Sequence, residues 1–332
     1  MSGASDDQSP STRLEQWISI GATVVAPATL LGALLFYFGY VSSRSQYAYF
    51  GVDVDTIGLN TQDYIMRSPQ PLLVPLLVLT LTGAGLLTLN AAVRARISSS
   101  VARAADKVNP GPGPERSVRR IRRSIQGTAV FGVTVLSAGI VLLFIYSYVR
   151  DWAYYGLVTP ILIAAGAALA AYAPRLMRLL PRPHEQPAAV RDAEAARRRP
   201  GPASNSPLAR RTANLLACVV IAASIFWATA TIAQWAGRGL AQYDALHFDS
   251  LPSVILDTKE RLFLHDPGIE ETVLPASEGQ TFHYRYRGLR LLIEGQNRMF
   301  LVPDTWSASD STLIVRLDGS VRVQFQFQNQ LP

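Results

Sequence analysis

The chain has 332 residues, of which 49% are hydrophobic and only 17% are charged, whereas soluble domains carry roughly 25% charged residues. This deficit argues against an ordinary soluble enzyme. The formal net charge is +7 and the pI is 9.7, which in a soluble chain would favour nucleic acid as a partner. The distribution of the charges along the chain excludes that interpretation, as shown below.

Five stretches contain no Asp, Glu, Lys, Arg or His, and we predict that each forms a transmembrane helix. A helix rises about 1.5 Å per residue, so crossing a hydrocarbon core of about 30 Å takes roughly 20 apolar residues. Only the fourth stretch is short, and the aromatic residues before it extend its outer end. The predicted spans are residues 17–41, 71–93, 127–149, 156–173 and 213–236.

Basic residues fix the predicted orientation of these spans. Residues 94–126 carry nine basic and two acidic side chains, and residues 174–212 carry nine and three. The positive-inside rule places both loops in the cytoplasm, which requires both spans between them to cross. The N-terminal tail, residues 1–16, is then cytoplasmic. The first outer loop and the mildly acidic segment 237–332 are extracytoplasmic, so nucleic acid is not an expected partner.

A basic segment leads into the third span. Val118, Ile121 and Ile125 recur at helical spacing and share one face, while four arginines take the other sides. We predict that these arginines contact anionic lipid headgroups at the cytoplasmic face, as in an interfacial helix. Passive anchoring is the alternative. The four residues are Arg119, Arg120, Arg122 and Arg123.

The first outer loop contains three carboxylates, Asp53, Asp55 and Asp63. Their spacing superficially suggests a calcium site, but the full set that a 12-residue EF-hand loop requires, namely regularly spaced oxygen ligands, a Gly at the sixth position and a terminal Glu, is absent. We therefore favour a small packed loop that caps the helix bundle.

The C-terminal segment predicts a small antiparallel β-domain, so the expected fold class is an α+β membrane protein. Residues 321–327 alternate apolar and polar side chains, which is typical of a half-buried strand. Asp318-Gly319 predicts a hairpin between this strand and residues 313–317. A second hairpin is predicted between residues 289–294 and 298–302, and further strands at residues 281–287, 254–256 and 262–264.

No catalytic, metal or cofactor motif is present. His247, His265 and His283 lack the close pairing typical of zinc ligands, and Cys218 lies within an apolar span where a thiolate is unfavourable. Nucleotide-binding and hydrolase fingerprints are also absent. We therefore predict a protein that is not an enzyme and that uses no cofactor.

One segment of the β-domain favours ligand binding. Arginine forks match carboxylate or phosphate groups, and neighbouring tyrosines add stacking surface. The alternative is a strand face with cross-strand ion pairs. The candidate ligand-binding residues are Tyr284, Arg285, Tyr286, Arg287 and Arg290.

The spans contain hydroxyl groups but no ionisable residue, which weakens the pump and proton-coupled transporter interpretations. Ser19, Thr29, Ser224 and Thr231 are candidates either to line a pore or to join helices. Small residues recur on one face of the first span, from Ser19 to Ala33, and on the fourth, at Ala164, Ala168 and Ala171. Such faces let helices pack closely, within one chain or between copies.

These patterns predict a bacterial plasma-membrane protein of five spans. The single cysteine and the Ala, Arg, Pro and Gly bias of the loops favour this location over a eukaryotic secretory route. We expect the β-domain to bind a protein partner or envelope ligand, as in a sensor, scaffold or accessory subunit. The alternative is an oligomeric channel with the β-domain as an outer cap.

Overall fold

The computed structural model describes residues 10–105, 113–177, 207–307 and 310–326. Among them it has five helices long and apolar enough to cross a membrane, as expected for a multi-pass membrane protein. They lie within α1 (Pro10–Tyr49), α4 (Pro69–Ala105), α5 (Gly113–Phe144), α7 (Tyr155–Met177) and α9 (Pro207–Leu246). The chain divides into two units, residues 75–231 and residues 1–74 with 232–332, and each is described by itself.

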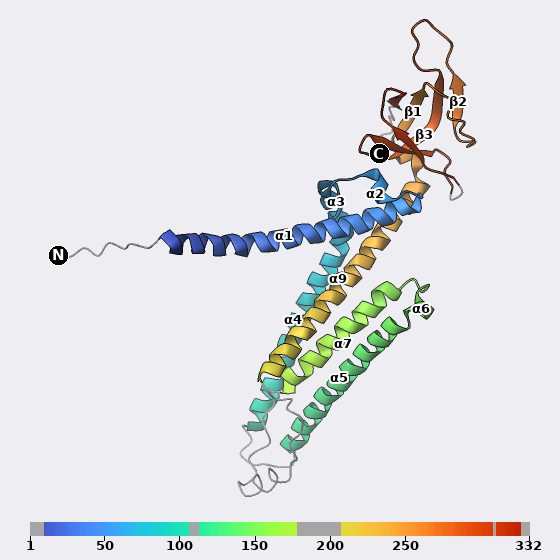
Figure 1. Cartoon of the computed structure of the whole chain (residues 1–332). Helices are drawn as coiled ribbons and strands as arrows, with labels where there is room; N and C mark the ends of the chain where they lie inside the picture. The colour runs from blue at the N-terminus through green and yellow to red at the C-terminus, as the bar shows by residue number, and fades with distance from the viewer. Residues whose placement is uncertain (1–9, 106–112, 178–206, 308–309, 327–332) are drawn as a thin grey trace, which may run out of the picture. The chain divides into compact units, whose positions relative to one another are not determined.

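In the first of these units, α5 and α7 lie side by side as an antiparallel pair (Figure 1). The buried residues of the described part of α5 recur at every seventh position, 125, 132 and 139. In α7, residues 159, 166 and 173 are buried at the same spacing, together with Tyr155, Pro160 and Ala167. A seven-residue repeat is the seam of a left-handed helix pair. A Cβ at Gly132 would lie 2.8 Å from the Ala170 nitrogen, so glycine sets the close approach.

One sequence prediction for this unit needs correction. The packed face of α7 is not the predicted alanine stripe, because Ala168 is exposed and the neighbouring Gly166 and Ala167 are buried. The basic segment leads into the third span, as the sequence predicts. It is continuous with the third span in α5, and Ile125 is buried in the helix. The predicted end of that span forms the short helix α6 (Tyr146–Val149).

In the other unit, α1 approaches two helices through glycine. A Cβ at Gly39 would collide with the Tyr64 carbonyl of α3 (Thr61–Arg67), and one at Gly237 of α9 would collide with the Ser42 carbonyl of α1. Ala233, Gly237 and Ala241 form a buried small-residue stripe on α9. Gln46 donates a hydrogen bond to Asp244 (3.1 Å) next to this contact.

The loop between the first two spans folds into α2 (Val54–Ile57) and α3, and two of its three carboxylates, those of Asp53 and Asp63, cap these helices. Asp53 is the N-cap of α2 and accepts from the Asp55 amide (3.2 Å). Asn60 and Asp63 form a reciprocal capping box on α3, with hydrogen bonds of 2.8 and 2.9 Å. These bonds satisfy amides at the helix starts that have no partner within the helix.

The β-domain is one antiparallel sheet of six strands (Figure 1). Its main order is β5-β4-β3-β1-β6, and β2 pairs with β3 off this path. A 3-10 turn, η1 (Phe248–Ser250), connects α9 to the sheet. The strands are β1 (Ser253–Thr258), β2 (Glu270–Val273), β3 (Tyr284–Gly295), β4 (Arg298–Pro303), β5 (Leu313–Arg316) and β6 (Val321–Gln326).

The predicted hairpin between β3 and β4 is confirmed, and Gln296 and Asn297 at its turn both have positive φ. The two strands predicted at 281–287 and 289–294 are instead one long β3, which is interrupted by a bulge where Gly288 has a φ of 77°. β2 was not predicted, and residues 262–264 do not form a strand.

The hairpin predicted across Asp318-Gly319 is wrong. The turn is present, with the Val321 amide donating to the Asp318 carbonyl (3.3 Å). However, β5 pairs with β4, and β6 pairs with β1 at the opposite edge. Five residue steps from Arg316 to Val321 span at most about 18 Å, whereas a flat five-stranded sheet is about 19 Å across. The sheet must therefore curl, which brings its edge strands towards each other.

The sheet and the loop between the first two spans share a hydrophobic core. Phe300 and Ile293 of the β3–β4 hairpin pack with Tyr47, Val54 and Ile57, and all five are buried. The tip of the hairpin meets the end of α2 closely, since a Cβ at Gly295 would lie 2.5 Å from the Ile57 carbonyl oxygen. A second cluster joins Phe50, Phe248 and Trp306, with ring centroids 5.1–6.4 Å apart. The helix ends and the sheet therefore form one packed body.

We expect Gly237→Ala to destabilise the protein by about 1–3 kcal/mol, because its methyl group would meet the Ser42 backbone rather than a movable side chain. Thermal unfolding of the detergent-purified full chain measures this loss. Gly239→Ala is the matched control: a Cβ at Gly239 meets nothing within 4 Å, and alanine favours helix. Equal unfolding temperatures for the two variants would contradict the close contact.

Candidate functional site

The predicted ligand-binding segment lies on β3, and its arginines are largely engaged within the sheet. Asp257, on β1, is fully buried and accepts two hydrogen bonds from Arg285, with Nε to Oδ1 at 2.8 Å and Nη2 to Oδ2 at 3.0 Å. Arg322 on β6 donates to the same carboxylate from the other side, with Nη2 at 2.5 Å. Asp257 therefore joins three adjacent strands.

This arrangement stabilises the charged form of Asp257. The hydrogen bonds from Arg285 lower the pKa of the carboxyl below its ordinary value, burial opposes this shift, and Arg322 lowers the pKa further. The pKa of Arg285 is raised by the same hydrogen bonds. Asp257 was not singled out from the sequence, because a lone aspartate in a short apolar strand does not reveal its cross-strand partners.

The two tyrosines of the segment belong to the core rather than to a binding surface. Tyr286 is fully buried, and its hydroxyl accepts a hydrogen bond from the Leu262 amide (2.8 Å). Burial raises the pKa of this hydroxyl. Tyr284 packs at the edge of the cluster that contains Tyr286, Leu256 and Leu289.

The remaining two arginines differ in their surroundings. Arg290 forms an ion pair with Asp304 and donates to the Leu251 carbonyl (3.0 Å). Arg287 is exposed on the strand face opposite to that of Tyr286, and it stands across from Glu270 of β2 in the sheet register. The five predicted residues are thus divided between ion pairs, core and surface, and they do not converge on one cavity among the described residues.

A different surface, not predicted from the sequence, lies beside β2. In the described part of the chain, β2 pairs on one side only, with β3. Val273 of β2 is 66% exposed, and Phe263 is 62% exposed with a φ of 52°. Arg261 lies over the Phe263 ring (5.0 Å) and pairs with Glu271 of β2 (2.6 Å). We call Arg261, Phe263 and Val273 the β2 edge patch.

The β2 edge patch has the features of a contact surface. A bulky residue at positive φ is a rare and strained conformation, and such strain is concentrated at functional sites. An unpaired strand edge offers backbone donors and acceptors to an incoming strand. The patch is identified by the positive φ of Phe263 and by the pairing of β2 on one side. Neither feature can be predicted from residue type, so the sequence did not indicate this surface.

The other predicted site residues lie on the helices. Arg122 and Arg123 are exposed on α5, whereas the side chains of Arg119, Arg120 and Ser19 lie outside the described part of the chain. Thr29 is exposed and bonds its own helix at Val25 (2.9 Å). Thr231 is buried and donates to the Gly156 carbonyl of α7 (2.8 Å), which joins two helices, and Ser224 is buried on α9.

No group of three or more His, Cys, Asp or Glu side chains that could hold a metal ion is found in the described ranges. His247 stacks on Tyr243 with ring centroids 4.3 Å apart, and its Nδ1 lies 3.0 Å from the Tyr243 carbonyl oxygen.

Comparison with known proteins adds no relative: no family model, curated protein or solved structure matches this chain.

We expect Asp257→Asn to destabilise the β-domain by about 2–4 kcal/mol, because it leaves two arginines without their buried partner. Their side chains are 24% and 48% exposed, so water offsets part of the loss. Amide hydrogen exchange of β1 and β6 in the full chain measures the effect locally. Glu278→Gln, at an exposed position, is the control and should change stability by no more than about 0.5 kcal/mol.

The ion pairs of Asp257 with Arg285 and Arg322 make the stability of the β-domain depend on pH. The folded pKa of Asp257 lies below its unfolded value of about 3.9. The stabilisation is therefore present above about pH 4 and is lost as the pH falls through the folded pKa. In the wild-type protein, the amides of β1 and β6 should lose protection from hydrogen exchange in this acid range. In Asp257→Asn, this acid-dependent loss should be absent. An unchanged acid profile in the variant would show that the ion pairs contribute little.

Proposed function

We propose that this protein is a non-enzymatic membrane protein whose β-domain binds a protein partner at the β2 edge patch. The observation that carries this proposal is the unpaired edge of β2 beside Phe263 and Val273, both more than 60% exposed. An extended partner segment can add a strand to such an edge, with backbone hydrogen bonds giving affinity and side-chain contacts giving specificity.

The packing of the sheet on the helices supports a sensor or scaffold role rather than that of a binding domain that is only tethered to the membrane. The hairpin of β3 and β4 packs on Tyr47, Val54 and Ile57, and Thr312 donates to the Phe50 carbonyl at the end of α1 (2.7 Å). Because these contacts link the sheet to the ends of α1 and α9, we expect a force on the sheet to be transmitted to both helices.

For the orientation in the membrane, we propose a cytoplasmic N-terminus and an extracytoplasmic β-domain in a bacterial plasma membrane. The support is the excess of basic residues in segments 94–126 and 174–212, which is the feature that sets membrane orientation. The exposed Arg122 and Arg123 are then available to anionic lipids on the cytoplasmic side.

To test partner binding, a photoreactive amino acid replaces Phe263 in the full chain in its native membrane. We expect one discrete covalent adduct with a second protein, identified by mass spectrometry, since the position faces the incoming strand. The added change Val273→Asp should reduce adduct yield at least about tenfold, because it places a charge in an apolar contact.

The same photoreactive residue at Ile314 is the control, since Ile314 is 52% exposed on another edge strand, β5. It should give no such adduct. The proposal fails if Phe263 yields no adduct, if Ile314 yields the same one, or if Val273→Asp leaves the yield unchanged while the protein remains folded.

The orientation is tested with single cysteines in a Cys218→Ser background. A membrane-impermeant maleimide should label Ser277→Cys in intact cells, because this exposed residue belongs to the β-domain. Ser98→Cys, exposed on α4 in the first basic loop, should react only after the membrane is permeabilised. The reverse pattern would place the β-domain in the cytoplasm.

A further inference from the structure

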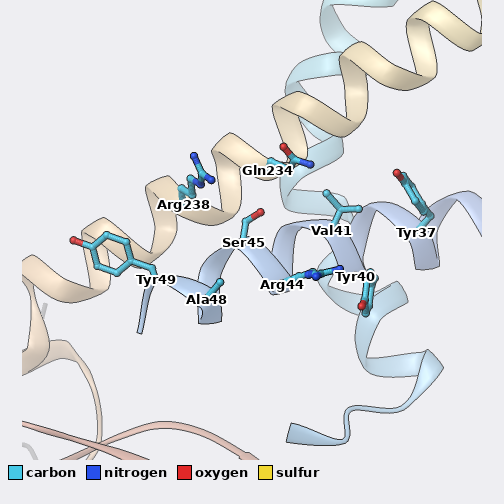
Figure 2. Close-up of a pocket in the computed structure, with 9 residues that line it drawn as sticks. All are labelled: Tyr37, Tyr40, Val41, Arg44, Ser45, Ala48, Tyr49, Gln234 and Arg238. Atoms are coloured by element: carbon cyan, nitrogen blue, oxygen red, sulfur yellow. The ribbon is translucent and has the colours of Figure 1, made fainter. Parts of the chain in front are cut away.

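A groove lies where α1 crosses α9, within the unit that contains the β-domain. Its volume is about 620 Å³, which is in the range of small-molecule sites. Figure 2 shows Arg44 on the α1 wall and Arg238 on the α9 wall, with Ser45 between them in this view. The lining residues are Tyr37, Tyr40, Val41, Arg44, Ser45, Ala48, Tyr49, Gln234 and Arg238.

The groove carries two positive charges and no negative one. Arg44 and Arg238 are both exposed, and neither forms an ion pair within the described residues. One lining residue contacts a carboxylate: the Tyr40 hydroxyl donates to Asp55 (3.3 Å), so this hydroxyl is already engaged. Two guanidinium groups at one groove attract an anion, and their forked donors match phosphate oxygens.

On both helices, the charged part of the groove lies just beyond the end of a span predicted from the sequence. Arg44 follows the last residue of the uncharged run 17–41 by three positions, and Arg238 follows residue 236 by two. The contact between Ser42 and Gly237 puts these two ends at the same place. Arginine and tyrosine at such a level meet lipid headgroups.

The part of the groove beside Tyr37 and Val41 is apolar, and both residues belong to the predicted span 17–41. Val41 and Tyr37 precede Arg44 by three and seven residues, which is about 4.5 and 10 Å along a helix. The groove thus changes from guanidinium groups to an aliphatic and aromatic surface along α1. A free phosphate ion would use only the first part, whereas a phospholipid has the chemistry to use both.

We propose that this groove binds one anionic phospholipid of the leaflet on the side of the β-domain. Arg44 and Arg238 hold the phosphodiester, Gln234 and Ser45 supply hydrogen bonds to the headgroup, and an acyl chain lies along Val41 and Tyr37. This site is distinct from the arginines of α5, which belong to a loop predicted on the other side of the membrane.

The test uses the full chain in nanodiscs that contain a phosphatidylglycerol with a photoreactive group near its headgroup. Mass spectrometry should locate adducts on the peptides that carry residues 37–49 and 234–238. Arg44→Gln with Arg238→Gln should reduce these adducts about tenfold or more, since each lost charge-assisted pair is a large part of the affinity. Adducts on α5 should remain and serve as the internal reference.

Lys259→Gln with Arg316→Gln is the matched control, because it removes two exposed positive charges from the β-domain and should leave groove labelling unchanged. Labelling that survives the loss of Arg44 and Arg238, or equals that of a photoreactive phosphatidylcholine, overturns the proposal. Displacement of the lipid by 10 mM inorganic phosphate would also overturn it, by assigning the site to a soluble anion. Equal unfolding temperatures of the variants confirm that they are folded.

Discussion

The hydrophobic core between the loop that joins α1 to α4 and the β3–β4 hairpin is the constraint on which this unit of the molecule depends. Phe300, Val54 and Ile57 have essentially no exposed surface, and burying each such side chain contributes about 1.5–3 kcal/mol. Neither the loop of some twenty residues nor the small sheet could bury these groups alone. Segments separated by more than 200 residues in the sequence therefore fold as one body, which includes the ends of α1 and α9.

Glycine makes this body compact. The backbones meet where a side chain would not fit: α1 with α3 at Gly39, α1 with α9 at Gly237, and the hairpin turn with the end of α2 at Gly295. Close contact at a helix crossing also leaves a groove beside it, because two cylinders separate on both sides of the point where they touch. The groove with Arg44 and Arg238 is thus a consequence of the same packing that holds the sheet to the helices.

The polar groups of the sheet show why a residue pattern alone is a weak guide to a binding site. Arg285, Arg290 and Arg322 stand on strands as if free to bind an anion, yet each has an acidic partner on another segment. Arg285 and Arg322 form ion pairs with Asp257 on the neighbouring strand, which is the arrangement that the sequence offered as the alternative to ligand binding. What remains accessible is the exposed apolar surface of Phe263 and Val273 in the β2 edge patch, and the groove, where Arg44 and Arg238 form no ion pair within the described residues.

The sequence by itself determined five apolar helices, the β-character of the C-terminal segment and the hairpin of β3 and β4, because these depend on local hydrophobicity, alternation and turn chemistry. It could not determine which strands pair over long distances. Asp318-Gly319 specifies a turn, but the partner of β6 depends on β1, some 65 residues earlier. Tertiary structure likewise decided the roles of Asp53, Asp55 and Asp63 as caps and hydrogen-bond acceptors, the burial of Tyr286, and the presence of Arg44 and Arg238 at one groove. Each of these depends on which surfaces meet and not on residue type.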